Sequence, residues 1–489
     1  MIWIIYVVVF LWLVRIVTNV LSYIHLWYVK EYRWDRMRIH LGTPQGKRIL
    51  FLPFRPPPLT PKTFVLFWAT LIILELIYVS LPRTSILLKL AVIDLLTFPV
   101  VSVIVWVLKI PTQLYHAYKI RRAIHLLRLH KPMRVIGITG SFGKTSTKEY
   151  LATILSSKYK VLKTSDSKNS PIGIAEVILG QLKPEHEIFI VEMGAYKKGE
   201  IAEMCHMVNP QIGIVTAINP QHQDLFGSIE TTMQAKYELI NGLPKDGIAI
   251  FNADNEKTLE MAQWAKREGK LVWVYAKEGK KLSNVDQIIR ARNVETKLDS
   301  VSFDVIMGKQ RANVEANVLG EHQVSNILAA ILAANAVGMN LEQAAKTAGN
   351  IRPFTKIMQQ VKGVNSALFI NDTFNNNPDA AKVAIDYLAQ TKGRKILVFQ
   401  PMIELGEYAD SAHWEVGEAA AKVCDEIYVT NATYIDAITA GVQSVNKNKQ
   451  VVALPAKAVA ARIKKQVTGG DTVLFKGKEA GYILRLLVK

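Results

Sequence analysis

The chain has few cysteines and few acidic residues for its length. Only Cys205 and Cys424 occur in 489 residues, and they fall in segments typical of separate domains. A disulfide framework and a cysteine-based zinc site are therefore not expected, and the soluble part fits a reducing compartment. Acidic residues number 41 against 60 lysines and arginines, which gives a formal net charge of +19. That excess indicates an anionic partner, which could be nucleic acid, anionic lipid or a polyanionic substrate.

Hydrophobic residues are concentrated in the first 110 positions. Three runs there are each long enough to cross about 30 Å of hydrocarbon as a helix: residues 2–28, 63–81 and 86–108. Arg15, Glu75 and Asp94 interrupt these runs, at a cost of about 2–3 kcal/mol each unless they face protein or reach an interface. Residues 2–28 lack a basic leading segment and a small-residue cleavage site, which disfavours a cleaved signal peptide. We expect a membrane domain of about three helices over residues 1–110.

Basic residues flank these runs on one side. The connection 29–62 is rich in lysine and arginine against only Glu31 and Asp35, and the stretch 109–134 is basic with no acidic residue. Because basic loops stay in the cytoplasm, we expect an outside N-terminus and a multi-pass protein of the cytoplasmic membrane with its catalytic domains on the cytoplasmic side. The membrane then accounts for much of the charge, and nucleic acid is not expected as a partner.

Residues 111–131 form a basic juxtamembrane segment with apolar residues at helical spacing. It is interpreted either as an interfacial helix on anionic membrane lipid or as a solvated linker helix, and both interpretations stay open.

Residues 134–146 carry the clearest functional motif. RVIGIT at 134–139 predicts a short buried strand, and a helical run begins after the glycine-rich loop. A strand, a glycine loop and a helix N-terminus together cradle phosphate groups. The predicted nucleotide-binding residues of this loop are Gly140, Ser141, Gly143, Lys144, Thr145 and Ser146. Lys144 would reach the terminal phosphates and Thr145 a magnesium ion, although Ile138 stands where the general phosphate-loop pattern has its first glycine.

Two further segments predict strands beside this loop. Residues 187–194 predict a buried strand whose end presents Glu192. Because a carboxylate at the carboxyl end of a parallel strand would lie close to the phosphates, Glu192 is a candidate magnesium ligand. Residues 211–219 predict a third strand, after which His222 follows in a turn. A loop histidine alone is weak evidence, but this placement makes His222 a second candidate metal ligand.

Seven sequence blocks, in order, resemble the Mur ligases over residues 132–489. They are TGSFGKTS, VEMGAYKKGEI, NPQHQDLFGSIETTMQAKYELI, GEHQVSNILAAILAANAVGM, NDTFNNNPDAAKVAIDYL, MIELG and GGDTVLFKGK. The resemblance implies that Lys144 and Thr145 bind phosphates and magnesium, and that Glu192 and His222 hold metal ions. It also implies that Lys236 is a lysine carbamylated to assist magnesium, that Asn326 contacts adenine, and that Asp372 contacts the ribose region. Lys144, Lys236 and His222 would then serve catalysis.

The implied reaction is ATP- and Mg²⁺-dependent. The γ-phosphate would pass to a substrate carboxylate, and an amine would then displace phosphate from the acyl phosphate. The simplest substrates are UDP-N-acetylmuramoyl-tripeptide and D-alanyl-D-alanine in peptidoglycan synthesis. In Mur ligases an N-terminal domain grips the UDP-sugar, whereas membrane spans stand there in this chain, so a lipid-linked or membrane-proximal donor stays open. So do a ligase that extends a polyglutamate-type chain and a membrane-coupled phosphate-loop ATPase.

The sequence departs from the family pattern around the C-terminal domain. Asn371 takes the place of the first acid of a paired-aspartate motif, Phe374 replaces a tyrosine, and Lys356 stands near an expected arginine. Gln400 and Pro401 replace a Gly-Asp pair. An Arg-to-Lys change keeps the charge but loses a planar, two-pronged donor. These departures therefore bear on how the C-terminal domain recognises the acceptor amine.

The expected architecture is α/β with transmembrane helices at the N-terminus. A phosphate-loop central domain over 132–350, with a β insertion at 277–318, would precede a C-terminal Rossmann-like domain over 351–489. In the latter, strands are predicted at 367–371, 395–399, 426–430 and 472–475, and helices at 378–391 and 411–423. No G-x-G-x-x-G fingerprint occurs there, so dinucleotide binding is not expected.

Overall fold

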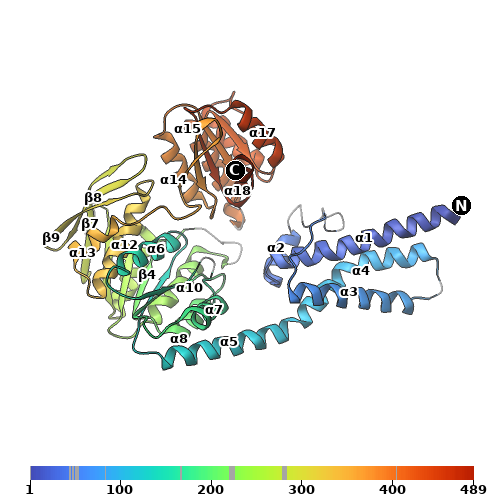
Figure 1. The fold of residues 1–489 in the computed structure, drawn as a ribbon, viewed down its shortest axis with the longest axis horizontal. Coiled ribbons are helices and arrows are strands. Elements are labelled where there is room, and N and C mark those ends of the chain that lie inside the picture. Colours follow the sequence, from blue (N-terminus) through green and yellow to red (C-terminus); the bar gives the residue numbers. More distant parts are fainter. Residues whose placement is uncertain are drawn as a thin grey trace. The chain divides into compact units, whose positions relative to one another are not determined.

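The computed structural model describes most of the chain and divides it into two compact units, residues 1–119 and residues 120–489. The described residues are 2–42, 46, 49, 54–82, 84–165, 168–219, 226–277, 284–402 and 405–488. Figure 1 shows an all-helical first unit and an α/β second unit, as the sequence predicts.

The first unit is built on three long apolar helices. They are α1 (Ile2–Val29), α3 (Pro61–Ser80) and α4 (Ile86–Val107), with the short α2 (Trp34–Gly42) after α1 and the start of α5 (Lys109–Leu129) after α4. By length and composition α1, α3 and α4 could each cross a membrane. The start of α3 is fixed locally, because Thr60 and Thr63 form a reciprocal capping box ahead of Pro61 at the first helical turn.

Two of the charged residues inside the apolar runs are paired with each other. Arg15 Nε donates to Asp94 Oδ2 at 2.8 Å, and Asn19 Nδ2 donates to Asp94 Oδ1 at 2.8 Å, so α1 and α4 share a polar cluster. In hydrocarbon an unpaired charge is costly, whereas a paired one can hold two helices together. Glu75 instead lies on an exposed face of α3.

The central domain is organised around one mixed sheet of nine strands, ordered β2-β3-β1-β4-β5-β6-β7-β8-β9. Its strands are β1 (Arg134–Thr139), β2 (Val161–Lys163), β3 (Ile188–Glu192), β4 (Ile212–Val215), β5 (Ile248–Asn252), β6 (Leu271–Ala276), β7 (Gln287–Thr296), β8 (Val301–Met307) and β9 (Gln310–Ala316). The pairings from β2 to β7 are parallel, and β8 and β9 continue the sheet antiparallel. The predicted β insertion is therefore the edge of the main sheet.

Helices cover both faces of this sheet. They are α6 (Lys144–Leu155), α7 (Pro171–Gln181), α8 (Glu200–Val208), α10 (Ile229–Asn241), α11 (Glu256–Arg267), α12 (His322–Ala336) and α13 (Leu341–Ala348). One buried core joins α6, α12 and α13 to the sheet, and a second joins α7, α8, α10 and α11, together with Ala123 of α5. Because β1 lies between β3 and β4, the loop after β1 opens at the centre of the parallel region, where ligands of such sheets bind.

The C-terminal domain has its own six-stranded sheet, ordered β10-β11-β15-β12-β13-β14. Its elements are β10 (Gln359–Lys362), η2 (Val364–Ser366), β11 (Leu368–Asp372), α14 (Pro378–Ala389), β12 (Lys395–Phe399), η3 (Gly406–Tyr408), α15 (Ala409–Val423), β13 (Glu426–Val429), α16 (Ile435–Val445), β14 (Val451–Ala453), α17 (Ala456–Gln466), β15 (Thr472–Lys476) and α18 (Lys478–Leu487). Only β10 is antiparallel to its neighbour. One core lies under α14, α15 and α16 and another under α17 and α18, so the sheet is covered on both faces, as in a Rossmann-like domain.

Candidate active site

The loop between β1 and α6 needs its two glycines. Gly140 has φ +144° and Gly143 has φ +81°, a region that favours glycine. A Cβ on Gly140 would lie 2.2 Å from Thr216 Oγ1, and one on Gly143 would lie 2.6 Å from Asn326 Oδ1. Ile138 is buried within β1, so the position where the general phosphate-loop pattern has its first glycine lies in the strand and not in the loop.

Lys144 folds back over this loop. Its Nζ donates to the carbonyl oxygens of Gly140 at 2.6 Å and Ser141 at 3.1 Å. Burial lowers the pKa of Lys144, and the nearby Glu192 carboxylate opposes that shift. The ammonium is thus held at the place where a strand, a glycine loop and a helix N-terminus meet. This is the place where terminal phosphates bind in phosphate-loop proteins.

The predicted oxygen ligands lie next to each other. Thr145 Oγ1 donates to Glu192 Oε2 at 3.0 Å, and β3 pairs with β1 so that Glu192 lies beside Ile138. Asn169 Nδ2 also donates to Glu192, at 3.3 Å. Among the described residues no group of three or more His, Cys, Asp and Glu side chains could hold a metal by itself. Mg²⁺ usually takes one or two protein oxygens and completes its shell with water and phosphate, which fits this pair.

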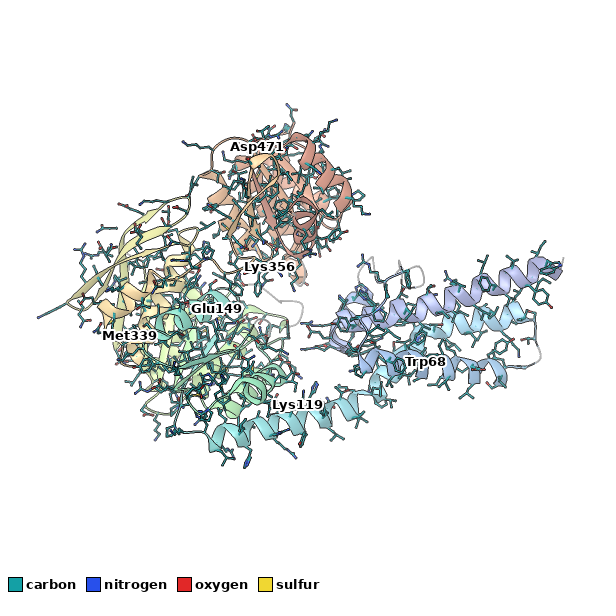
Figure 2. All side chains as sticks on the ribbon, in the orientation of Figure 1. Trp68, Lys119, Glu149, Met339, Lys356 and Asp471 are labelled. Atoms are coloured by element: carbon teal, nitrogen blue, oxygen red, sulfur yellow. The ribbon has the colours of Figure 1, made fainter. Side chains whose placement is uncertain are left out.

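Lys148 is a component of this site that the sequence analysis missed. Its side chain is fully buried, with Nζ 3.3 Å from Glu192 Oε2 and 3.4 Å from Glu149 Oε1. Glu149 lies on α6 and is labelled in Figure 2, and it also pairs with Lys163 of β2. Lys148 lies one helical turn after Lys144, so helical spacing alone could have placed both lysines on the face toward Glu192.

His222 lies outside the described residues, and its assignment as a metal ligand stays a prediction. Lys236 is described, in α10, and is 3% exposed. Burial and, to a smaller extent, the positive charge of Lys144 lower the pKa of Lys236 to about 7. Near neutral pH much of this lysine is therefore the uncharged amine, which is the form that can react with carbon dioxide to give a carbamate. The carbamylation of Lys236 that the family resemblance implies stays a prediction.

Asn326 lies against the start of α6. Its Oδ1 accepts a hydrogen bond from Thr147 Oγ1 at 3.4 Å, and its Nδ2 donates to Gln323 Oε1 at 3.0 Å. Ser146 lies in the first turn of α6 and is buried. The structure therefore brings Asn326 to the loop from α12, almost two hundred residues away in sequence.

Asp372 ends β11 in the C-terminal domain. Its Oδ2 accepts from Lys476 Nζ at 2.6 Å and its Oδ1 from the Met358 backbone amide at 3.3 Å. Both oxygens thus have protein partners, and a ribose contact stays a prediction. Nearby, His322 has a buried Nδ1 without a hydrogen-bond partner in the part of the chain that the structure describes. Burial lowers the pKa of His322 to about 4, and the charge of Asp372 opposes that shift, so this histidine is neutral at pH 7.

The residues that depart from the family pattern have local structural partners. Asn371 Oδ1 accepts from Thr373 Oγ1 at 2.7 Å, and the Phe374 ring packs edge-on against Phe354. Lys356, marked in Figure 2, has φ +68° and its carbonyl accepts from the Phe374 amide. Gln400 Oε1 accepts from the Glu479 amide at 2.9 Å in the first turn of α18.

Comparison with known proteins agrees with this geometry. The "Mur ligase middle domain" profile matches residues 138–334, and the "Mur ligase, glutamate ligase domain" profile matches residues 358–479. UDP-N-acetylmuramoyl-tripeptide–D-alanyl-D-alanine ligases of Synechocystis and Bacillus subtilis are 32% and 30% identical to the chain. The Synechocystis match covers 71% of the chain and 72% of that relative, and the Bacillus match covers 73% and 75%. The chain belongs to the Mur ligase family.

Other comparisons give the extent of this relationship. The ligase of the same name from Escherichia coli is 32% identical, over 60% of the chain and 63% of that relative, so the chain spans less than two thirds of the relative's length. Among solved structures, MurF from Acinetobacter baumannii superposes with a TM-score of 0.66 at 25% identity, covering 76% of this chain and 79% of that chain. MurF from Thermotoga maritima in complex with ADP gives 0.65 at 25%, covering 76% and 82%.

Proposed function

We propose that this ligase uses ATP and Mg²⁺ to join a carboxylate to an amine, and that it adds D-alanyl-D-alanine to UDP-N-acetylmuramoyl-tripeptide in peptidoglycan synthesis. One observation carries the proposal. Lys144, Thr145 and Glu192 meet at a glycine loop in the middle domain of a Mur ligase fold. The similar proteins of Escherichia coli, Synechocystis and Bacillus subtilis are named UDP-N-acetylmuramoyl-tripeptide–D-alanyl-D-alanine ligases.

The residues suit transfer of the γ-phosphate to a carboxylate. Loop amides and the N-terminus of α6 would bind the phosphates, and Lys144 would neutralise charge on the transferred group. Thr145 and Glu192 would hold Mg²⁺, which offsets phosphate charge when bound. The acyl phosphate formed would then be attacked by the amine, and the tetrahedral intermediate would expel phosphate.

A panel of substrates tests the reaction. We expect phosphate release only when ATP, UDP-N-acetylmuramoyl-tripeptide and D-alanyl-D-alanine are all present, with equal amounts of ligated product by mass spectrometry. Glutamate in place of the dipeptide is the comparison, because the departures at Asn371, Phe374 and Gln400 leave a different acceptor as the second candidate. Full-rate ATP hydrolysis without any carboxylate substrate would contradict both ligase candidates, whichever amine they use, and would favour a membrane-coupled ATPase.

We propose in addition that the ligase is a multi-pass protein of the cytoplasmic membrane, in contact with anionic lipid, with residues 120–489 in the cytoplasm. The three apolar helices and the basic stretches at 29–62 and 109–134 support this. The full chain is expected in the membrane fraction after an alkaline wash. Of two reporters fused after Lys489, the one that works only in the cytoplasm should be active. Activity of the one that works only in the periplasm would overturn the proposed orientation.

A further inference from the structure

Helix α14 of the C-terminal domain touches the central domain at both of its ends. At its last turn, Tyr387 Oη donates to the Leu298 carbonyl, in the turn between β7 and β8, at 2.5 Å. At its first turn, Asp379 Oδ2 accepts from Asn219 Nδ2 at 2.7 Å. The Tyr387 contact lies at the turn between β7 and β8, whereas the Asp379 contact lies beside the phosphate loop.

Asn219 connects α14 to that loop through its backbone. Its amide donates to Ser141 Oγ at 3.2 Å, and Ser141 Oγ donates to the Asn219 carbonyl at 3.3 Å. Both residues are buried, at 4% and 6% exposure. The Ser141 amide is also fixed, because it donates to the Ala217 carbonyl at 2.7 Å. Two hydrogen-bond steps thus separate the Asp379 carboxylate from the phosphate loop.

We propose that Asp379 is a positioning residue that ties the C-terminal domain to the phosphate loop through Asn219 and Ser141. The inference rests on the proposed ligase function, because the tie sets where groups of the C-terminal domain stand relative to the phosphoryl group. Asp379 also lies in the first turn of α14, where a carboxylate stabilises any helix. That role needs no partner on another domain, so the bond to Asn219 is the evidence for the tie.

Matched variants of the full-length ligase separate the two roles. Asp379→Ala removes the acceptor, Asp379→Asn keeps a side-chain oxygen that can accept from Asn219, and Asn219→Ala removes the donor while leaving the backbone bonds to Ser141. Asp386→Ala is the control, because Asp386 lies on the same helix with an exposed side chain. All four should keep the thermal midpoint near that of the unmodified ligase.

The expected kinetic result follows from loss of one charged hydrogen bond that positions the reacting groups. Asp379→Ala and Asn219→Ala should each lower kcat about 10–100-fold, with the Kd for ADP changed less than about threefold. The double variant should be no worse than either single one, because both remove the same bond. Asp379→Asn should recover most of the rate, and Asp386→Ala should match the unmodified ligase.

Hydrogen–deuterium exchange provides a readout that does not depend on turnover. Asp379→Ala should raise exchange in peptides covering residues 137–146, which are far from α14 in sequence, while Asp379→Asn and Asp386→Ala should not. Absence of ligation by the unmodified chain would contradict the proposed function. The exchange of residues 137–146 would still show whether Asp379 ties the C-terminal domain to the loop. Unchanged loop exchange in Asp379→Ala, or equal kinetic damage in Asp379→Asn, would overturn the positioning role.

Discussion

Replacing Lys144 with alanine is expected to lower ATP-dependent phosphate release about 10²–10³-fold, the usual effect of losing one preorganised group that stabilises transition-state charge. The structure gives the reason. Lys144 Nζ is held by the carbonyls of Gly140 and Ser141 at the mouth of the loop, so its charge is in place before substrate arrives. The measurement is initial-rate phosphate release with the full substrate set.

Lys309→Ala serves as the control for this experiment. Lys309 is an exposed lysine at the turn between β8 and β9, and its loss changes the net charge by the same amount. We expect Lys309→Ala to behave as the unmodified ligase and both variants to unfold at the same temperature. A Lys144→Ala rate within about threefold of the control would contradict the assignment of the loop as the phosphoryl-donor site.

The phosphate loop could be predicted from sequence because its determinants are local. Gly140, Gly143 and Lys144 act within a few residues of one another, and their positive φ angles and helix start follow from residue type. Glu192 could be predicted too, since carboxyl ends of parallel strands meet at one edge. The exact strand lengths could not. The predicted strand 211–219 is shorter in the structure, where it spans Ile212–Val215. Beyond it, Thr216 Oγ1 donates to the Phe142 carbonyl and the Asn219 amide donates to Ser141 Oγ.

Contacts between segments that are distant in the chain could not be predicted from the sequence. Helical spacing could have placed Lys148 on the same face of α6 as Lys144, but not its ion pair with Glu192, because Glu192 comes from β3. Likewise the Asn219–Asp379 bond joins residues 160 positions apart. The strand order was also hidden, since neighbours in a sheet need not be neighbours in the chain. The domain limits at 110, 131 and 350 stay predictions.

The Asp372–Lys476 pair should be the most sensitive point of the C-terminal domain. The two side chains are 8% and 2% exposed, and their charged atoms are 2.6 Å apart across neighbouring strands β11 and β15. Lys476→Met keeps the volume but leaves a buried carboxylate unpaired, at a cost of about 3–5 kcal/mol. For a domain of this size that corresponds to a midpoint lower by roughly 6–20 °C. Differential scanning calorimetry of the full-length ligase measures it.

Lys478→Met is the control for this last experiment, because Lys478 lies two residues further on and is exposed. Its expected effect is within about 0.5 kcal/mol. Combining Lys476→Met with Asp372→Leu should recover part of the loss, since removing both charges also removes the unpaired one. Recovery will be incomplete, because the Met358 amide loses its acceptor. If Lys476→Met and Lys478→Met unfold at the same temperature, the Asp372–Lys476 pair does not stabilise the domain.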